Sequence, residues 1–436
     1  MTTAQNGLLV AAPQSGSGKT VVTLALLRAL SKRGIDVAAA KAGPDYIDPA
    51  FHALASHRAS VNLDPWAMTS ARLKALAGVQ KGSHLLVEAM MGLFDGAADG
   101  SGSAADLAST LGLPVVLVVD AGKLSHSVAA LARGFRDHRS GIDVAGVILN
   151  KVGSARHEAM LRDALGSIGM TVFGAVPRSA ELVLPERHLG LVQAGEHSDM
   201  EAFIERASDI VGKAVDIDAL LAAFTTVNIG GEADGLTPQG LRPLGQRIAI
   251  ARDNAFSFLY PHMAEDWRRA GAAFSFFSPL ADEAPEVNAD AVYLPGGYPE
   301  LHGGRLAGNA RFLDGLRQAA SRGALIYGEC GGYMVLGEGL VDAEGQRHTM
   351  AGLLKLETSF AERRLHLGYR RLEAGQGFAL GQRLTAHEFH YSIAQREEGE
   401  PLFYAHDALG EDLGMAGLRA GNVMGSYMHV IDRIEP

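Results

Sequence analysis

Short apolar segments alternate with longer amphipathic stretches between Gly7 and Pro177. The apolar segments read GLLVAAP, DVAAAKAG, HLLVEAMMG, PVVLVVDAG, VAGVILNKV and TVFGAVP. Runs of this length that are rich in β-branched and aliphatic residues are typical of parallel strands connected by helices. Segment 19–33 has apolar residues spaced four apart and is followed by Gly34. We therefore predict a helix that ends at this glycine.

A second series of apolar segments begins at Arg247 and reads RIAIARD, DAVYLPGGYPE, GALIYGECGGYMVLGE and GNVMGSYMHV. A helix is predicted near 262–271. Residues 225–246 separate the two series, and they are rich in glycine, proline and polar residues without periodicity, which is typical of a linker. A chain of 436 residues is also too long for one ordinary core. We expect an α/β protein with a first domain at 1–230, a linker at 231–246 and a second domain at 247–436.

The composition narrows the class of protein and of partner. Hydrophobic residues make up 47% and charged residues 20% of the chain, as in soluble globular proteins. The formal net charge of -10, without any basic stretch, argues against binding to nucleic acid. The N-terminal residues show no secretory signal pattern, and no apolar run is long enough for a membrane span, so we expect a cytoplasmic protein without a membrane partner. Cys330 is the only cysteine, which leaves either a buried apolar side chain or a reactive thiol.

A glycine-rich turn follows the first predicted strand. It consists of Gln14, Ser15, Gly16, Ser17, Gly18, Lys19 and Thr20 and leads directly into the predicted helix. Such a turn lets backbone N–H groups and the positive end of the helix face bound phosphates, while the lysine reaches the outer phosphates and the threonine hydroxyl is available to Mg²⁺. The motif departs from the usual phosphate loop at its first position, where Pro13 replaces glycine. A chance glycine turn is the alternative, but the strand before it and the helix after it favour a nucleotide site.

Charged residues follow the next predicted strands, at the positions where parallel strands end. They are Lys41, Asp45 and Asp48 after the second strand, and Glu88 and Asp95 after the third. A magnesium nucleotide needs carboxylates near Thr20, and in a doubly wound sheet these come from the C-terminal ends of neighbouring strands. Acids in turns are equally compatible with simple solvation, but their shared location favours function. Asn150, which ends VAGVILN, is a candidate for a hydrogen bond to the nucleotide base, or else a polar cap of its strand.

The segment GALIYGECGG places Cys330 between an apolar strand and a helical stretch, next to glycines. This arrangement is typical of a nucleophile elbow, in which small neighbours permit a sharp turn and backbone N–H groups face a developing oxyanion. A buried inert thiol is the alternative. His429 in SYMHV is the candidate general base, and the candidate oxyanion groups are Gly296, Gly297 and Gly331. The motif HEFH at 387–390 is not a zinc signature, because its histidines are three apart and no further ligand is evident.

With both sites present, the whole chain resembles the cobyrinic or hydrogenobyrinic acid a,c-diamide synthases of corrinoid (vitamin B12) biosynthesis. The segments that carry the resemblance are PQSGSGKT, KAGPDYIDPAFH, VEAMMGLFDG, PGGYPE and GECGGYM. The first half is similar to the dethiobiotin-synthetase-like branch of P-loop proteins. The second half is similar to class I glutamine amidotransferases of the cobalamin-synthase type. In this family the proline at the start of the phosphate loop is a shared trait.

The resemblance implies a role for each candidate residue. ATP and Mg²⁺ would be held by Lys19 and Thr20 together with Lys41, and the metal also by Asp45 and Glu88. Asp48 and Asp95 would act around the substrate carboxylate and its phosphorylated intermediate. Cys330 would be the glutaminase nucleophile and His429 its base. Class I glutaminases carry a glutamate two residues after that histidine, whereas this chain has Ile431, so the orienting acid stays open between Asp432 and Glu388.

The implied activity is an ATP-dependent amidation of a corrinoid tetrapyrrole with L-glutamine as nitrogen donor. ATP would convert a carboxylate into an acyl phosphate, and ammonia released by Cys330 would then displace the phosphate. Alternatives are a,c-diamidation of Ni-sirohydrochlorin, amidation of other side chains by a cobyric acid synthase, and a partition-type ATPase switch. The switch is disfavoured by Gln14, where such proteins carry a signature lysine. Whether the macrocycle carries cobalt stays open, and so does the oligomeric state, for which relatives in the dethiobiotin branch favour a homodimer.

Overall fold

The computed structural model of the chain describes residues 5–80, 82–184, 186–187, 190–191, 199–229 and 240–434. The chain divides into two compact units, Met1–Pro238 and Gln239–Pro436. Residues 231–239 of the expected linker lie outside the described residues.

The first unit is built on a parallel sheet with the strand order β3-β2-β4-β1-β5-β6-β7. The strands are β1 (Asn6–Ala11), β2 (Val37–Ala42), β3 (Val61–Leu63), β4 (His84–Glu88), β5 (Val115–Asp120), β6 (Val144–Val152) and β7 (Val172–Pro177). A short strand, β10 (Thr225–Thr226), pairs antiparallel with β1. Because β1 lies between β4 and β5, the chain reverses its direction of winding there, and such a switch point is where doubly wound sheets bind ligands.

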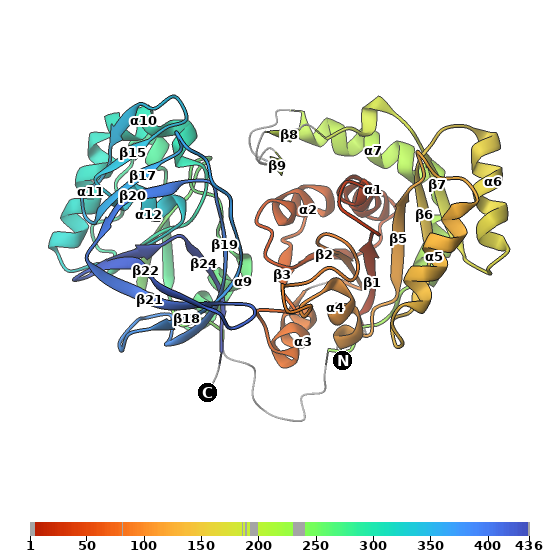
Figure 1. Cartoon of the computed structure of the whole chain (residues 1–436), viewed down its shortest axis with the longest axis horizontal. Coiled ribbons are helices and arrows are strands. Elements are labelled where there is room, and N and C mark those ends of the chain that lie inside the picture. Colours follow the sequence, from red (N-terminus) through yellow and green to blue (C-terminus); the bar gives the residue numbers. More distant parts are fainter. Residues whose placement is uncertain are drawn as a thin grey trace. The chain divides into compact units, whose positions relative to one another are not determined.

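Helices cover this sheet. They are α1 (Lys19–Lys32), α2 (Asp48–Ser56), α3 (Ser70–Val79), α4 (Ala104–Leu111), α5 (Ser127–Asp137), α6 (Ala155–Gly166), α7 (Met200–Ala214) and α8 (Ile217–Ala222). Helix α1 packs against α2 and α7, which lie next to it in Figure 1. Its apolar residues join those of β1 in one core, in which Leu8, Leu26 and Leu30 are fully buried.

The main sheet of the second unit has the order β12-β11-β13-β14-β23-β22-β21-β18-β19-β24. Its parallel part consists of β11 (Arg247–Ala251), β12 (Ala273–Phe277), β13 (Ala291–Leu294), β14 (Leu325–Glu329) and β23 (Val423–Ser426). Antiparallel strands continue it: β18 (His366–Ala374), β19 (Arg383–His390), β21 (Glu400–Asp407), β22 (Asp412–Ala420) and β24 (Met428–Arg433). The helices are α9 (Pro261–Arg269), α10 (Gly303–Gly308), α11 (Ala310–Ser321) and α12 (Gly331–Leu336), with a short 3-10 turn η5 (Pro299–His302).

A smaller sheet in the second unit has the order β16-β15-β17-β20. Its strands are β15 (Gly339–Val341), β16 (Arg347–Thr349), β17 (Lys355–Ser359) and β20 (Ile393–Glu398). The pattern of apolar segments did not predict this sheet. The α/β character of both units and the helices predicted at 19–33 and near 262–271 are confirmed.

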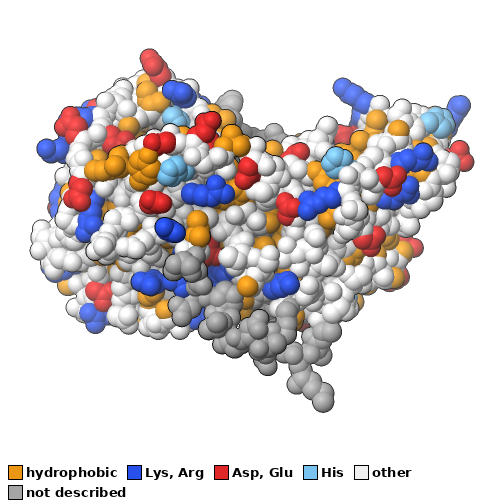
Figure 2. Space-filling model, turned by 60° about the horizontal axis from the view of Figure 1, so that its bottom comes forward, with side chains coloured by type: hydrophobic (Ala, Val, Ile, Leu, Met, Phe, Trp, Pro, Cys, Tyr) orange, Lys and Arg blue, Asp and Glu red, His pale blue; other side chains and the backbone are white. Residues whose placement is uncertain are grey.

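Charged side chains of both signs are interspersed over the face of the molecule in Figure 2, as far as the structure describes it. Exposed ion pairs within one helix include Arg162 with Glu158 and Arg269 with Glu265. No helix among the described residues is both long and apolar enough to cross a membrane.

Candidate functional site

The phosphate loop joins β1 to α1 through a turn that only glycine adopts without strain. Gly16 and Gly18 have φ values of 78° and 84°, in the left-handed region. The Ser17 hydroxyl donates to the Gln14 carbonyl (2.9 Å) and closes the turn from inside. Gln14, Ser15 and Gly16 are exposed, so their backbone is accessible to a ligand.

Asn150, near the end of β6, is buried and contacts this turn. Its side-chain nitrogen donates to the Ser17 carbonyl (2.8 Å), and its side-chain oxygen accepts the N–H of Lys151 (2.9 Å). A Cβ at Gly18 would overlap the Asn150 amide. Glycine is therefore required at this position both by the positive φ angle and by the space that Asn150 occupies. Asn150 thus supports the phosphate loop, and its contact with a nucleotide base stays a prediction.

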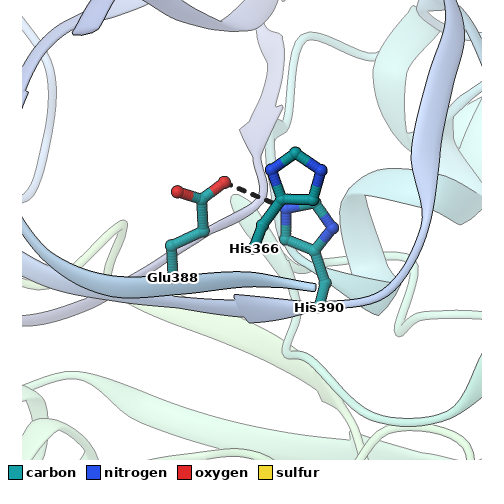
Figure 3. A group of neighbouring side chains, drawn as sticks. All are labelled: His366, Glu388 and His390. Carbon is teal, nitrogen blue, oxygen red and sulfur yellow. Dashed lines mark hydrogen bonds and ion pairs between the residues drawn. The ribbon is translucent and has the colours of Figure 1, made fainter. Parts of the chain in front are cut away.

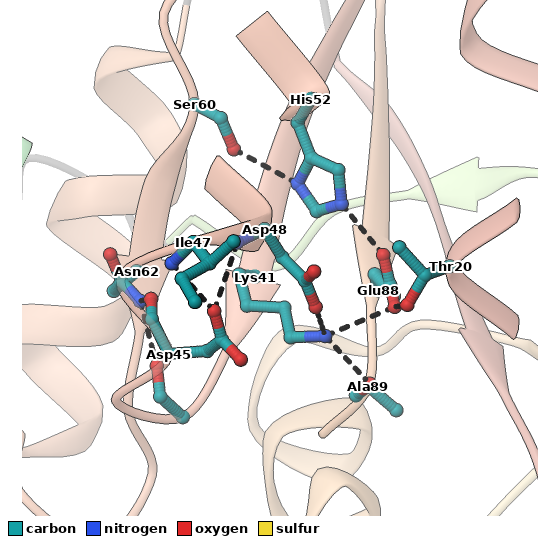
Figure 4. A network of polar contacts seen from close by, with 11 residues as sticks. Thr20, Lys41, Asp45, Ile47, Asp48, His52, Ser60, Asn62, Glu88 and Ala89 are labelled. Carbon is teal, nitrogen blue, oxygen red and sulfur yellow. Dashed lines mark hydrogen bonds and ion pairs between the residues drawn. The ribbon is translucent and has the colours of Figure 1, made fainter. Parts of the chain in front are cut away.

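A buried network connects the first turn of α1 with the ends of β2 and β4 (Figure 4). The Thr20 hydroxyl donates to Glu88 Oε1 (2.7 Å), and Lys41 Nζ donates to the same oxygen (3.0 Å). Lys41 also forms an ion pair with Asp48 at the start of α2. The structure therefore brings together four residues that the sequence placed near the nucleotide.

Opposite charges in this network offset the effect of burial, which alone would favour the neutral forms of Lys41 and Glu88. Although burial alone would lower it, the carboxylates of Asp48 and Glu88 raise the pKa of Lys41 above its usual range. Burial would raise the pKa of Glu88, but Lys41 and the hydrogen bond from His52 hold it well below its usual range. Burial and the neighbouring Asp45 raise the pKa of Asp48. At neutral pH the network therefore contains one charged lysine among ionised acids.

The donor set fits a magnesium ion. Hydroxyl and carboxylate oxygens are the ligands that Mg²⁺ prefers. Thr20 and Glu88 offer them within one network, and Asp45 lies next to it at the start of α2. Asp48 Oδ1 is buried and has no hydrogen-bond partner among the described residues. Lys19 is nearly buried, and burial together with the charge of Lys41 lowers its pKa, so a phosphate would compensate two closely placed ammonium groups.

Asp45 lies at the edge of this network, whereas Asp95 belongs to the loop that follows β4. Asp45 Oδ1 accepts the N–H groups of Ile47 (2.8 Å) and Asp48 (2.9 Å) and so caps the start of α2. Asp95 is exposed, and its Oδ2 accepts the N–H of Gly92 (2.8 Å). Asp45 as a metal ligand and Asp95 as a group acting on substrate stay predictions.

His52 is a member of the network that sequence reasoning missed. It is fully buried on α2, its Nε2 lies 2.7 Å from Glu88 Oε2, and its Nδ1 lies 3.3 Å from the Ser60 hydroxyl. The signal that could have revealed it is its position four residues after Asp48, which places both residues on the same side of helix α2.

Cys330 occupies a sharp turn between β14 and α12 in the second unit. Its φ of 46° and ψ of -104° are unusual for a residue with a side chain and indicate a strained elbow. The Cys330 N–H donates to the Ser426 carbonyl of β23 (2.8 Å). The two glycines that follow Cys330 permit the turn, because a Cβ at Gly332 would overlap the Leu294 carbonyl and one at Gly331 would lie 2.7 Å from Pro299.

His429 of β24 lies against the glycine turn that follows β13. A Cβ at Gly296 would overlap its imidazole, and Phe258 packs against it with ring centroids 6.2 Å apart. The same turn reaches the elbow, since a Cβ at Gly331 would lie 3.1 Å from Gly297 N. The three glycines predicted for the oxyanion site, together with Cys330 and His429, therefore line one region.

Burial keeps the thiol and the imidazole neutral in the absence of substrate. It raises the pKa of Cys330, with a further contribution from the charge of Glu300. It lowers the pKa of His429 to about 3, with help from His387 and His390. A neutral imidazole is able to accept the thiol proton when substrate binds.

Two histidines and a glutamate form a cluster beside this site (Figure 3). The side chains of His366, Glu388 and His390 bring one ligand atom each to within 4.8 Å of one another. The imidazole planes of His366 and His390 are parallel, at 4° and 4.6 Å between centroids, so their lone pairs do not converge. Arg370 also pairs with Glu388 (2.6 Å). We interpret this group as a hydrogen-bonded network, and His390 in turn stacks on Tyr427.

Comparisons with known proteins match both halves of the chain. Residues 8–192 match the CobQ/CobB/MinD/ParA nucleotide binding domain, and residues 247–433 match the CobB/CobQ-like glutamine amidotransferase domain. The predicted pairing of a P-loop domain with a glutamine amidotransferase domain is confirmed.

Similar proteins extend over the full length. A hydrogenobyrinate a,c-diamide synthase of a Sinorhizobium species is 61% identical over 431 residues, which cover 98% of this chain and 99% of the relative. One from Rhizobium meliloti is 59% identical over 98% of this chain and 99% of its own length. One from Rhodobacter capsulatus is 53% identical over 99% of this chain and 100% of its own length.

Proposed function

The chain belongs to the family of hydrogenobyrinate a,c-diamide synthases, and we propose that it amidates the a- and c-acetate carboxylates of hydrogenobyrinic acid, using ATP and glutamine-derived ammonia. The observation that carries this proposal is the presence in one chain of a phosphate loop with a buried lysine–carboxylate network and a cysteine on a strained elbow. The names of the relatives favour the macrocycle without cobalt over cobyrinic acid and over Ni-sirohydrochlorin.

The first unit would activate the carboxylate. The phosphate loop binds the nucleotide through its exposed backbone, and Lys19 and Lys41 neutralise charge on the phosphoryl group that is transferred. Thr20, Glu88 and Asp45 would hold Mg²⁺, which reduces the negative charge of the phosphates when it is bound. Asp48 and Asp95 would orient the substrate carboxylate. The product of this half is an acyl phosphate with a good leaving group.

The second unit would release ammonia from L-glutamine. Cys330 loses its proton to His429 and attacks the side-chain amide, and the backbone N–H groups of Gly297 and Gly331 stabilise the oxyanion. Ammonia leaves, and water hydrolyses the glutamyl thioester. Ammonia then displaces phosphate from the activated acid.

Mass spectrometry of the macrocycle after incubation with Mg-ATP and glutamine tests the substrate. Hydrogenobyrinic acid is expected to gain two amides in successive steps, while cobyrinic acid and Ni-sirohydrochlorin react more slowly under the same conditions. Failure to amidate any of these acids would reject the assignment.

The Cys330→Ala variant tests the division of labour. It is expected to lose amidation with glutamine and to keep amidation with an added ammonium salt at the wild-type rate. Undiminished use of glutamine by this variant would show that the nucleophile lies elsewhere.

A further inference from the structure

Glu329 is a buried carboxyl group beside the proposed glutaminase pair, and the reaction described above does not use it. It is the last residue of β14 and directly precedes Cys330, and its side chain is 1% exposed. Tyr293 Oη donates to Glu329 Oε2 at 2.8 Å, and the N–H of Val430 donates to Oε1 at 3.2 Å. Glu329 Oε2 also lies 4.0 Å from His429 Nδ1.

These contacts hold the carboxyl group at one side of the histidine. Tyr293 belongs to β13, and Val430 follows His429 on β24, so two strands fix the position of Glu329. A separation of 4.0 Å is longer than a hydrogen bond, but catalytic hydrogen bonds commonly shorten when substrate binds.

The two nitrogens of His429 therefore have different surroundings. Nδ1 faces Glu329, and Cε1 packs against Gly296. Nε2 is the nitrogen that we assign to the proton of Cys330. An imidazole that works through Nε2 must carry its own proton on Nδ1, where an acceptor stabilises it.

We infer that Glu329 is the positioning acid of the glutaminase: it holds the His429 tautomer with the proton on Nδ1 and stabilises the imidazolium that forms during the reaction. This inference rests on the proposed roles of Cys330 and His429. It explains how the chain can have Ile431 at the position where class I glutaminases carry their glutamate.

The other two candidate acids contact different groups. Glu388 Oε2 accepts from Arg370 Nε (2.8 Å), and its Oε1 lies 3.0 Å from His390 Nε2. Asp432 Oδ1 accepts the N–H of Arg433 (2.9 Å). Glu329 is thus the candidate whose carboxylate lies within ion-pair distance of Nδ1 in the structure.

The proton transfers balance in this arrangement. The thiol proton of Cys330 moves to Nε2, the thiolate forms a bond to the amide carbon, and the carbonyl electron pair moves to oxygen. The imidazolium then returns that proton to the departing nitrogen as the C–N bond breaks and ammonia leaves. Glu329 keeps its negative charge throughout and faces the Nδ1 proton.

Several titratable groups face this pair. They are Tyr293 from β13, Tyr327 from β14, Cys330 directly after β14, and His387, Glu388 and His390 from β19. Burial raises the pKa of Glu329 to about 7, opposed in part by the Tyr293 hydroxyl. The pKa of His429 lies near 3. Glutaminase kcat/KM should therefore rise with pH through about 7 as Glu329 ionises.

The test compares Glu329→Gln with Glu329→Asp, Glu388→Gln and Asp432→Asn in the full chain. We expect Glu329→Gln to lower kcat for glutamine hydrolysis by about 10²- to 10⁴-fold, because an amide favours the wrong tautomer of the histidine. The rise of kcat/KM near pH 7 should disappear in this variant and persist in Glu329→Asp, which keeps a carboxylate. Amidation with ammonium salts and the KM for glutamine should change little.

Tyr293→Phe gives a second measurement that does not remove the acid. Because the tyrosine hydroxyl stabilises the ionised carboxylate, its loss should move the rise of kcat/KM to higher pH. An unshifted profile would contradict the inference, as would a Glu329→Gln enzyme within about threefold of the wild-type kcat or a larger loss in Glu388→Gln or Asp432→Asn. Glutamine use by Cys330→Ala would instead reject the proposed function itself.

Discussion

At the scale of single residues, the first unit places charges where water is excluded. Lys41 and Glu88 have side chains that are 3% and 0% exposed, and Asp48 is 6% exposed. A buried ion pair contributes little net stability, but the loss of one partner leaves an uncompensated charge, which is costly. Such a network fits a site that must be organised before a polyanion arrives.

Lys41→Ala tests this view of the network. We expect the free energy of unfolding of the first unit to fall by about 3–5 kcal/mol, because Asp48 and Glu88 lose their buried cation. Amidation should be lost with both glutamine and ammonium. Chemical denaturation measures the stability, and Lys32→Ala is the matched control, since Lys32 is 43% exposed and pairs with exposed acids. The control should lose no more than about 1 kcal/mol, and equal losses in the two variants would contradict the argument.

The raised pKa of Glu329 also predicts how the free energy of unfolding depends on pH. Its pKa rises from 4.5 to about 7 on folding, so the folded state keeps a proton that the unfolded state has lost. The stabilisation is complete below pH 4.5 and is lost as the pH rises through 7, which amounts to about 3 kcal/mol. His429 acts in the opposite direction, because its pKa falls to about 3. The difference in unfolding free energy between wild type and Glu329→Gln, measured at pH 5 and pH 8, isolates the carboxyl group, and an unchanged difference would refute the prediction.

At the scale of elements, the turn between β1 and α1 depends on one glycine for two reasons. Gly18 has a φ of 84°, and its missing side chain leaves room for the Asn150 amide. Gly18→Ala should therefore cost at least about 1–2 kcal/mol and displace the loop, which raises the KM for ATP. Gly34 has a φ of 74° with open space around it, so Gly34→Ala should lose about 1 kcal/mol and leave this KM unchanged. Initial rates at varied ATP separate the two, and equal values of KM would contradict a specific role of Gly18.

Elements with a strong local signal could be predicted from the sequence. The phosphate loop and the Cys330 elbow each combine an apolar strand, glycines and a helix within about fifteen residues, and the structure has them as β1–α1 and β14–α12. The run GNVMGSYMHV is one apolar segment in the sequence, whereas the structure divides it into β23 and β24, which pair with different neighbours. The antiparallel strands β18 to β22 were not predicted, because short alternating segments depend on long-range partners.

At the scale of the whole molecule, the nucleotide site and the glutaminase site could be predicted from the sequence, but the long-range contacts within each site could not. Glu329 and His429 are separated by a hundred residues, and His52 of helix α2 meets Glu88 of β4. No local pattern reports such pairs, because only the tertiary fold brings residues so far apart in the sequence into contact. The family resemblance assigned the nucleophile and base, but it left the third member open between two acids that the structure engages elsewhere.

If each unit carries one partial reaction, a variant in one unit should lose its own partial reaction and keep the other. Lys19→Ala removes the ammonium that we propose to neutralise the phosphates, so it should abolish amidation with either nitrogen source and keep glutamine hydrolysis. Cys330→Ala should do the reverse, losing hydrolysis and keeping amidation with ammonium. In an equimolar mixture of the two variants, ammonia can pass between chains only through solution, where at neutral pH it is mostly protonated. Product should therefore appear after a lag and at the rate that the accumulated ammonium supports in a separate ammonium titration. Full wild-type rate without a lag would mean that the nitrogen does not need to be released and used within one chain.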